Sequence, residues 1–435
     1  MSEEFRPRLH FSPAQGWMND PNGLIKVDGV YHLFFQHDPG SINHGPMHWG
    51  HACSTDLVTW RELPVALYPN ELGTCFSGTA VEGADGEIKL FYTAHRRIDD
   101  QDYQVQCLVH ADQSLTTFRF DAANPVLDNP GLVCFRDPKV LWHEASKRWV
   151  MAVTHGQSIG FYSSQDQIDW HFESSFGEGH GRHSDGPWEC PDLFPIMDSR
   201  GAEHWILIVG IGSGAYAAGS GTQYFVGQFD GSAFVNDNRP GTTLWLDYGR
   251  DFYAAQTFFD RQGAAPIVLG WASNWQYARI TPTENFRGVM SLPRTLSLTE
   301  TRQGLRLAQS LPPSVAAAFD ASADPGVYRR EVELPLTVGQ SMNIALFGEH
   351  QPQFRVTRTA ADEATILVIR SQTPAIPAFG HSYSVVAPFP KAGPLRLDIH
   401  VDRGVVELAT ADGLIWITQL FYPPPAGEHK LVGLR

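Results

Sequence analysis

Three carboxylic side chains stand in short strings whose neighbours could tune them for acid and base chemistry. Asp20 lies in WMNDPNG (17–23), Asp137 in FRDPKV (135–140) and Glu189 in WECPDLF (188–194). Carboxyl groups can divide the roles of nucleophile and general acid when their surroundings hold them in different protonation states. A Trp and a Cys flank Glu189, and such apolar surroundings favour the protonated form of a carboxyl group. The three strings therefore predict carboxylate catalysis if the fold brings them together.

Each string alone also has an ordinary structural explanation. Asp-Pro and Asn-Gly are common turn formers, and an Arg directly before an Asp describes many surface ion pairs of little energetic value. A lone Glu beside a Trp carries little information. A turn explains DPNG but leaves Trp17 and Asn19 unexplained, so the combination favours a functional site.

Repeating hairpins are the elements that must position these residues. The first two-thirds of the chain contains β-branched and aromatic runs joined by polar turns, as in GLIKVDGVYHLFFQHD and TAVEGADGEIKLFYTA. Asp-Gly between two such runs indicates a hairpin turn. Aligned on their first strands, the units begin at Asp20, Ser77, Asp137, Asp192 and Asp251, with spacings of 57, 60, 55 and 59 residues. Units of this length are close to the ~40–50 residues of a four-stranded propeller blade, so residues 1–301 are predicted to form a five-bladed β-propeller.

The propeller provides a meeting point for the three carboxylates. The first strand of each blade lines the central channel, so residues at the same phase of the units converge. Asp20, Asp137 and Glu189 all lie at or just before the first strand of their units. We therefore expect them to share one end of the channel.

The last quarter of the chain has a different pattern. Residues 302–325 lack hairpin alternation and are expected to form a linker with about one helical turn. From Val327 onward, strings such as VYRREVELPLTV and LRLDIHVDRGVVELATADGLIWITQLFY alternate at period two. They predict a β-sandwich over residues 326–435. The expected fold is all-β, a five-bladed propeller followed by a C-terminal β-sandwich.

Composition argues against several kinds of partner and cofactor. A formal net charge of −15 over 435 residues, with no basic run, makes nucleic acid or an anionic membrane surface an unexpected partner. No stretch approaches the ~20 apolar residues of a membrane helix, and MSEEFRPRLHFSP lacks an apolar secretory segment, so a cytoplasmic location is expected. The five cysteines form no CxxC pair, and His180 and His183 lack partners at metal spacing, so no metal site is expected. Twelve Trp and thirteen Tyr suit a neutral sugar, although large all-β proteins bury many aromatic residues anyway.

Taken together, the strings resemble the signature set of glycoside hydrolase family 32, the family of invertases, inulinases and levanases. The resemblance spans nearly the whole chain, and the family's fold of a propeller followed by a sandwich agrees with the fold predicted above. Further matching strings are FFQ (34–36), HWGHA (48–52), FSGTA (76–80), QYFVGQFDG (223–231), DYGRDFYAAQTFF (247–259), GWASNWQYA (270–278), RGVMSLPR (287–294) and VDRGVVEL (401–408).

The resemblance implies a retaining β-fructofuranosidase with Asp20 as nucleophile, Glu189 as acid/base and Asp137 as transition-state stabiliser. It implies terminal non-reducing β-D-fructofuranosides as substrates, such as sucrose, fructo-oligosaccharides, inulin or levan, and no cofactor. Repulsion from two ionised aspartates is expected to keep Glu189 protonated as the acid. The residues implied at the fructose pocket or its rim are Asn19, Gln36, Trp49, Phe76, Ser77, Arg136, Asp192, Asp251 and Trp275.

His44 departs from the family pattern. The family has a second Trp five residues before the Trp of the WGHA string, and this chain has His44 at that position. We expect His44 near the pocket, where imidazole covers less of a sugar than indole and can hydrogen-bond to hydroxyl groups. Nearby carboxylates are expected to favour its charged form.

Two alternative functions stay open at the level of sequence. A fructosyltransferase on the same scaffold would pass the covalent intermediate to a sugar hydroxyl instead of water, and the sequence does not decide this partition. A non-catalytic fructan-binding protein would keep the fold after its site had decayed. The intact set of Asp20, Asp137 and Glu189 argues against the latter. Chain-length preference, linkage preference and oligomeric state are left open.

Overall fold

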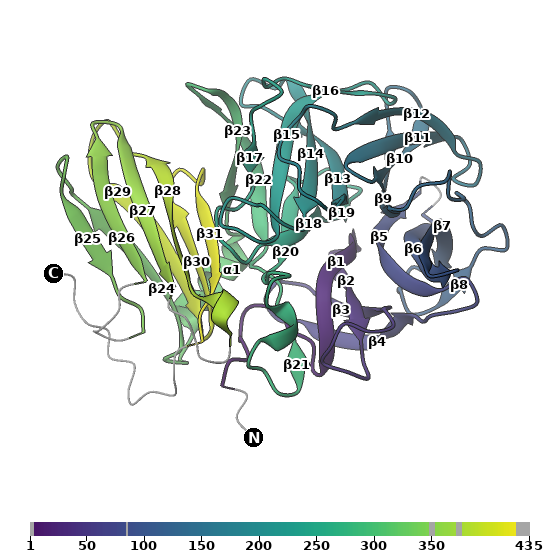
Figure 1. Ribbon diagram of the computed structural model, residues 1–435, viewed down its shortest axis with the longest axis horizontal. Coiled ribbons are helices and arrows are strands. Elements are labelled where there is room, and N and C mark those ends of the chain that lie inside the picture. Colours follow the sequence, from purple (N-terminus) through teal and green to yellow (C-terminus); the bar gives the residue numbers. More distant parts are fainter. Residues whose placement is uncertain (1–3, 84–85, 348–352, 371–375, 423–435) are drawn as a thin grey trace.

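The computed structural model describes residues 4–83, 86–347, 353–370 and 376–422, and these residues form seven β-sheets (Figure 1). Five sheets come first in the chain, and two follow. The first sheet contains β1 (Gly16–Val27), β2 (Val30–Asp38), β3 (His48–Ser54) and β4 (Arg61–Leu67), with the short β19 (Phe259–Asp260) and β21 (Phe286–Arg287) parallel to β1. The second contains β5 (Thr74–Glu82), β6 (Ile88–Ile98), β7 (Gln101–Ala111) and β8 (Phe118–Phe120).

The third to fifth sheets repeat this antiparallel plan. The third contains β9 (Phe135–His143), β10 (Arg148–His155), β11 (Ser158–Ser164) and β12 (His171–Phe176). The fourth contains β13 (Trp188–Met197), β14 (Glu203–Ile211), β15 (Gly221–Phe229), β16 (Phe234–Asn236) and β17 (Leu244–Trp245). The fifth contains β18 (Tyr253–Thr257), β20 (Ile267–Trp271), β22 (Arg294–Thr301) and β23 (Gly304–Ser310).

The first strands of the five sheets form a closed ring. Strands β1, β5, β9, β13 and β18 contact one another in this order, and β18 contacts β1 again. Each sheet is therefore one blade of a five-bladed propeller, with its first strand at the central channel (Figure 1). The predicted repeat starts fall in or just before these five strands, which confirms the blade assignment.

The predicted hairpin turns have the expected cause where the structure describes them. Asp28 and Gly29 connect β1 to β2, and their φ angles are +48° and +82°. Positive φ at both central residues is what a two-residue type I′ turn requires, and Asp-Gly meets this requirement with little strain. The second predicted turn contains residues 84–85, which lie outside the described residues.

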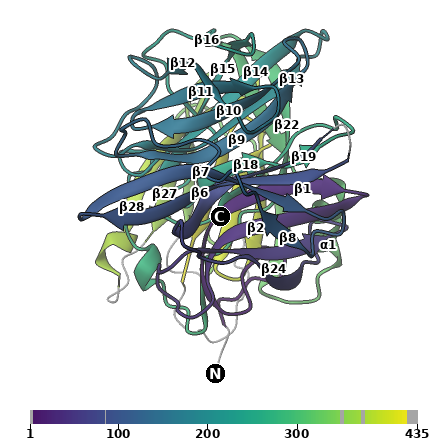
Figure 2. The same ribbon diagram turned by 90° about the vertical axis from the view of Figure 1, so that its right-hand side faces the viewer.

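Two further sheets pack face to face as a β-sandwich after the propeller (Figure 1), and the sandwich lies behind the propeller in Figure 2. One contains β24 (Val327–Leu334), β29 (Leu395–Asp402), β30 (Val405–Thr410) and β31 (Trp416–Leu420). The other contains β25 (Ser341–Ile344), β26 (Phe354–Ala360), β27 (Glu363–Arg370) and β28 (His381–Pro388). Their inward residues, such as Phe354, Ile366 and Ile399, form one buried core, which confirms the predicted alternation.

Residues 302–325 differ from the expected linker. Strand β23 pairs along its length with β22 and completes the fifth blade, and α1 (Pro313–Ala321) is a helix of nine residues. The alternation of β23 is masked because Gln309 is buried, where it contacts Arg294 and the carbonyl of Leu246. Helix α1 buries Val315 and Phe319, four residues apart on one face, in the core of the first blade. Two short 3₁₀ turns, η1 (Ala278–Ile280) and η2 (Pro377–Phe379), complete the described helices, and none of these is long and apolar enough to cross a membrane.

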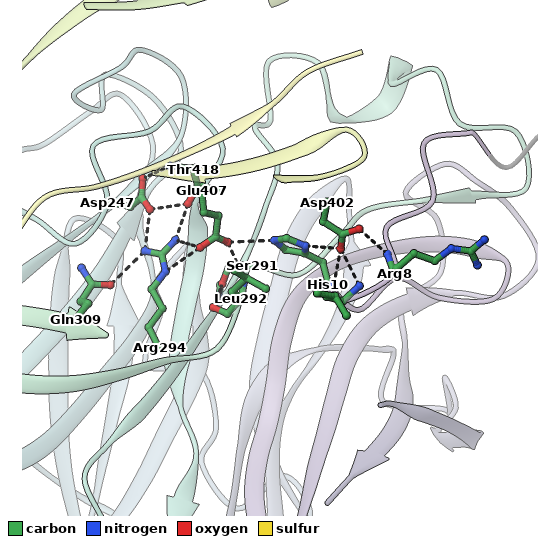
Figure 3. Close-up of polar contacts among 12 residues, drawn as sticks. Arg8, His10, Asp247, Ser291, Leu292, Arg294, Gln309, Asp402, Glu407 and Thr418 are labelled. Atoms are coloured by element: carbon green, nitrogen blue, oxygen red, sulfur yellow. Dashed lines mark hydrogen bonds and ion pairs between the residues drawn. The ribbon is translucent and has the colours of Figure 1, made fainter. Parts of the chain in front are cut away.

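A buried polar network joins the propeller to the sandwich (Figure 3). Arg294 of the fifth blade forms ion pairs of 2.8 Å with Asp247 and with Glu407 of β30. The imidazole of His10 lies between Asp402 of β29, at 2.8 Å, and Glu407, at 3.4 Å. All five side chains are buried. Because an unpaired buried charge costs several kcal/mol, by rough estimate, each domain needs the other's residues at this contact.

Candidate active site

A β-bulge recurs in the first strand of every blade. The strand pairings shift register at residues 18–21, 75–78, 136–139, 189–192 and 253–256. Three residues at these bulges have φ near the left-handed region, namely Asp137 at +63°, Cys190 at +50° and Ala254 at +52°. A bulge turns side chains away from simple alternation. The five bulges therefore aim polar side chains from all five blades at one end of the channel.

Asp20 lies at the bulge of β1 with its two carboxylate oxygens in different surroundings. Its Oδ2 accepts a hydrogen bond of 2.8 Å from the hydroxyl of Ser77 in the second blade. Its Oδ1 is buried and accepts no hydrogen bond from the described residues. Burial raises the pKa of the Asp20 carboxyl, the nearby amide of Asn19 lowers it, the charge of Glu189 raises it, and the hydrogen bond from Ser77 lowers it. Oδ2 is thus anchored by Ser77, whereas Oδ1 has no such hydrogen bond.

Asp137 lies at the bulge of β9 and is fully enclosed by protein. Its Oδ2 accepts a hydrogen bond of 2.9 Å from the backbone N–H of Cys190, and its own N–H donates to the hydroxyl of Thr93. Burial raises its pKa to about 7; Arg136 lowers it, and the charges of Glu189 and Asp20 raise it. The three carboxylates are therefore close enough to influence one another's ionisation.

Glu189, at the bulge of β13, is the most accessible of the three, with 23% of its side chain exposed. Its Oε1 accepts hydrogen bonds from Nη2 of Arg136, at 2.8 Å, and from Nε, at 3.3 Å. Its Oε2 accepts a hydrogen bond from the hydroxyl of Tyr253 in the fifth blade. The sequence-based expectation that Glu189 stays protonated considered only repulsion from the two aspartates. The structure adds the guanidinium of Arg136 at Oε1 and the phenol of Tyr253 at Oε2.

The thiol of Cys190 lies between the two aspartates. Its Sγ is 3.6 Å from Oδ2 of Asp20 and 3.7 Å from Oδ2 of Asp137. Burial raises its pKa, and the charges of Asp137 and Asp20 add to the shift, so the group stays a neutral thiol that can donate to either carboxylate. The five cysteines are free thiols.

Aromatic side chains form one wall beside the carboxylates. The indoles of Trp17 and Trp275 stack with ring centroids 6.0 Å apart, and Trp271 packs 4.8 Å from Trp275. Phe76 stacks on His95 at 4.2 Å and belongs to the same cluster as Trp17, Cys190 and Tyr253. Such faces can cover the apolar C–H surface of a sugar ring.

Several predicted pocket residues hold this arrangement together. Asn19 accepts a hydrogen bond of 2.7 Å from the indole of Trp17. The amide of Gln36 donates to the carbonyl of Cys75, and the indole of Trp49 donates to the carbonyl of Phe76, both at 2.9 Å. These contacts fix the start of β5, which carries Phe76 and Ser77. Direct contact of Asn19, Gln36 or Trp49 with a sugar stays a prediction.

Asp192 and Asp251 are engaged in contacts with other residues, so their contact with a sugar stays a prediction. Asp192 is fully buried along β13, where it forms a 2.7 Å ion pair with Lys139 and accepts a hydrogen bond from the N–H of Thr257. Asp251 is fully buried at the domain interface, where it binds Arg370 at 2.6 Å. Neither shares a hydrogen-bonding partner with the three site carboxylates among the described residues. Residue spacing alone could not reveal this, because the partner of Asp251 lies on a sandwich strand over a hundred positions later.

His44 lies at the aromatic wall, as expected from its position in the sequence. Its ring packs edge-on against Trp17 and Trp275, with centroids 5.8 Å away in each case. The expected charged form is corrected by the structure. Burial lowers the pKa of His44 and nearby Arg279 lowers it further, while Asp38 opposes the shift. The imidazole is therefore neutral near pH 7.

The sequence reasoning missed the roles of Tyr253 and Cys190. Cys190 lies in WECPDLF and Tyr253 in DYGRDFYAAQTFF, but neither was predicted as a site residue. Alignment of the units on Asp192 and Asp251 missed them, whereas alignment on the bulges would place Tyr253 at the same phase as Glu189.

Among the described residues, no three His, Cys, Asp or Glu side chains are arranged to hold a metal ion.

Comparison with known proteins identifies similar chains over nearly the whole length. The glycosyl hydrolases family 32 N-terminal domain matches residues 10–310, and the family's C-terminal domain matches residues 295–432. A levanase from Bacillus subtilis (strain 168) is 39% identical, over 97% of this chain and 67% of that protein. An extracellular exo-inulinase from Aspergillus ficuum is 33% identical, over 98% of this chain and 91% of that protein.

Solved structures agree with this assignment. The crystal structure of an exo-inulinase from Aspergillus awamori superposes with a TM-score of 0.83 at 31% identity, covering 97% of this chain and 93% of that one. A fructofuranosidase from Schwanniomyces occidentalis, solved in complex with fructose, has a TM-score of 0.80 at 28% identity, with the same coverage.

Proposed function

The chain belongs to glycoside hydrolase family 32, and we propose that it is a retaining β-fructofuranosidase that removes terminal non-reducing β-D-fructofuranosyl units through a covalent fructosyl-enzyme. The coarser statement, that it is a glycoside hydrolase of the group that contains levanases, inulinases and invertases, follows from its relatives. The proposal adds the mechanism, the roles of the residues and the substrates.

In the first step, Oδ1 of Asp20 attacks the anomeric carbon of the fructosyl unit. Glu189 donates its proton to the glycosidic oxygen, the bond between that oxygen and the anomeric carbon breaks, and the leaving sugar departs as an alcohol. In the second step, Glu189 takes a proton from water, and the water oxygen bonds to the anomeric carbon. The ester bond to Asp20 breaks and regenerates its carboxylate. Asp137 binds hydroxyl groups of the fructosyl unit and, as a carboxylate, stabilises the developing positive charge, while Arg136 donates hydrogen bonds to hydroxyl groups.

The hydrogen bonding of Asp20 is the observation that carries this proposal. A nucleophilic carboxylate needs one oxygen held in place and one free to bond, and Asp20 has this asymmetry between Oδ2 and Oδ1. Glu189 is the more exposed carboxylate, which suits a group that must meet both a leaving sugar and an incoming water. The assignment of nucleophile and acid/base thus rests on accessibility and hydrogen bonding, in addition to the motif.

The substrates are proposed from the names of the relatives and from the aromatic wall. The relatives include a levanase, exo-inulinases and an invertase, and solved neighbours bind fructose and fructosylnystose. The proposed substrates of this chain are sucrose and fructo-oligosaccharides, and inulin or levan as longer fructans.

The anomeric form of the first product tests the mechanism. Two displacements return the configuration of the substrate, so NMR at early times should show β-fructofuranose. Initial release of the α-anomer would mean inversion and would remove Asp20 as nucleophile. Rates on sucrose, kestose, inulin and levan, measured side by side, would set the substrate preference. A fructose deficit relative to glucose at high sucrose would identify transfer in place of hydrolysis.

A further inference from the structure

Tyr253 holds the carboxyl group of Glu189 from the opposite side to Arg136. It lies at the bulge of β18, is almost fully buried, and donates its hydroxyl hydrogen to Oε2 of Glu189. Its ring packs over Gly210 of β14, where a Cβ atom would lie 2.8 Å from the ring. A side chain at position 210 would therefore displace the phenol, so the close approach depends on glycine.

Arg136 and Tyr253 both donate hydrogen bonds to Glu189, but only Tyr253 can also accept one. The guanidinium of Arg136 offers only N–H groups and has no acceptor, whereas a phenol hydroxyl can donate or accept. Oε1 already accepts two hydrogen bonds from Arg136, so a proton on Oε1 would point at the N–H groups of that residue. A proton on Oε2 meets a hydroxyl group that can turn or can donate to the second lone pair. Oε2 is therefore the oxygen that can carry the proton.

We propose that Tyr253 is a positioning residue that directs the acid proton of Glu189 to Oε2 and stabilises that oxygen as a carboxylate when the proton leaves. This inference rests on the proposed acid/base role of Glu189. As the proton moves to the glycosidic oxygen, negative charge develops on Oε2 and the hydrogen bond from Tyr253 strengthens. In the second step, the same bond holds Oε2 toward the incoming water.

The surrounding groups let Tyr253 act as a donor throughout the working range of pH. Glu189 is faced by Arg136 and Asp137 from β9, by Asp20 from β1, by Tyr253 from β18 and by its neighbour Cys190. Burial raises the pKa of Tyr253 and the charge of Glu189 raises it further, so the phenol stays protonated. The hydroxyl is thus always available to the carboxylate.

Tyr253→Phe tests the proposal because it keeps the ring and removes only the hydroxyl. Loss of a hydrogen bond to a charged group should lower kcat/KM about tenfold and move the basic limb of the pH profile to higher pH. The limb moves in that direction because the ionised form of Glu189 loses a donor and so keeps its proton to higher pH. A purely structural role would lower the rate at every pH and leave the limb in place.

Two further variants separate the possible outcomes. Tyr224→Phe is a matched control, since Tyr224 is also buried and its hydroxyl accepts a hydrogen bond from the N–H of Leu307, away from the site. It should leave the limb unmoved. Glu189→Gln should abolish the limb together with most of the activity. If Glu189→Gln keeps both, the proposed function fails; if it loses both while Tyr253→Phe leaves the limb in place, only the role of Tyr253 is overturned.

Discussion

At the scale of single residues, the contacts of Asp20 predict what its replacement should cost. Asn at position 20 keeps an oxygen for the hydrogen bond from Ser77 but cannot form the covalent ester. Asp20→Asn should therefore fold normally, as judged by circular dichroism, and lose about 10³-fold or more in kcat. Substantial remaining turnover would contradict the assignment of Asp20 as nucleophile.

Glu189 should show a different signature, because its loss can be bypassed. An activated fructoside needs no proton on its leaving group, so a Glu189→Ala variant should still form the fructosyl-enzyme and then stall. External azide should restore turnover, since it needs no general base and fits the space left by the carboxyl group. Release of fructosyl azide would be the measured product. Asp20→Ala, the matched control, should yield no β-fructosyl azide, and absence of any rescue in Glu189→Ala would count against its role.

Replacement of Asp137 should raise stability and lower activity. Its pKa is about 7 in the folded chain and near 4 when unfolded, so between these pH values the folded state holds a proton that the unfolded state has lost. Stability therefore falls as pH rises through this window. Asp137→Asn removes the buried charge and keeps an acceptor for the N–H of Cys190. Its melting temperature should exceed that of the parent by about 2 °C or more above pH 7 and by nothing near pH 4, as scanning calorimetry would show.

The same Asp137→Asn variant should lose activity while it gains stability. Removing one group that stabilises transition-state charge costs about 10²-fold or more in kcat. A variant that loses activity without the pH-dependent gain in melting temperature would show that the Asp137 carboxyl is not strained by burial.

His44 predicts a change in sugar affinity that does not depend on pH. Because burial and Arg279 lower the pKa of His44 and so keep the imidazole neutral near pH 7, its contribution to KM should be constant between about pH 7 and 8. His44→Ala should raise KM for sucrose and kestose about threefold or more through lost contact, and His44→Trp should change both values, with stability unaffected. His48→Ala serves as the control, since His48 at the start of β3 contacts the carbonyl of Pro46. Unchanged kinetics in both His44 variants would mean that His44 packs on the aromatic wall without contacting the sugar.

The meeting of the three carboxylates could be predicted from sequence, whereas their electrostatics could not. The strings around Asp20, Asp137 and Glu189 carry distinctive neighbours, and the repeat explained how they meet. The charge state of His44 could not be predicted, because Arg279 comes from a turn over two hundred positions away. The contacts of Glu189 were missed for the same reason, since Tyr253 belongs to another blade.

At the scale of elements, alternation predicted the strands but not their bulges. A period-two pattern reports which face of a strand is buried, and most blades follow it. A bulge adds one residue to one strand, so the pattern is lost near Asp137, Cys190 and Ala254, where the backbone enters the left-handed region. These are the positions that aim the site residues into the channel. The geometry of the candidate site therefore depends on local departures from the pattern that predicts the blades.

At the scale of the whole molecule, the sandwich supports the strand that carries Tyr253. Arg370 of β27 binds Asp251, and the backbone N–H of Leu420 also donates to that carboxylate at 2.8 Å. Asp251 lies two residues before Tyr253. The domain interface thus lies two residues along the chain from the tyrosine whose hydroxyl group contacts Glu189. Sequence predicted the two domains but not this connection, since it joins positions that only the folded chain brings together.

The second connection between the domains predicts how the protein responds to alkaline pH. Burial alone would lower the pKa of His10, but the carboxylates of Asp402 and Glu407 raise it to about 9. An unfolded histidine titrates near 6.5, so this ion pairing stabilises the fold fully below that pH and is lost as pH rises toward about 9. His10→Gln should therefore lower the free energy of unfolding by about 3 kcal/mol at pH 6, and the two proteins should converge above about pH 9.

Chemical denaturation of both proteins from pH 6 to pH 10 would measure this difference. His171→Gln is the control, because His171 is exposed on an outer strand of the third blade, and it should follow the parent at every pH. The contribution of Asp137 to stability changes between about pH 4 and 7, whereas that of His10 changes mainly between about pH 6.5 and 9. The two contributions can therefore be separated in one series. Activity of His10→Gln at pH 6 should match the parent wherever the variant is folded, since His10 contacts the domain interface and none of the site carboxylates. A constant difference between His10→Gln and the parent from pH 6 to pH 10 would mean that His10 contributes by packing and carries no charge in the interface.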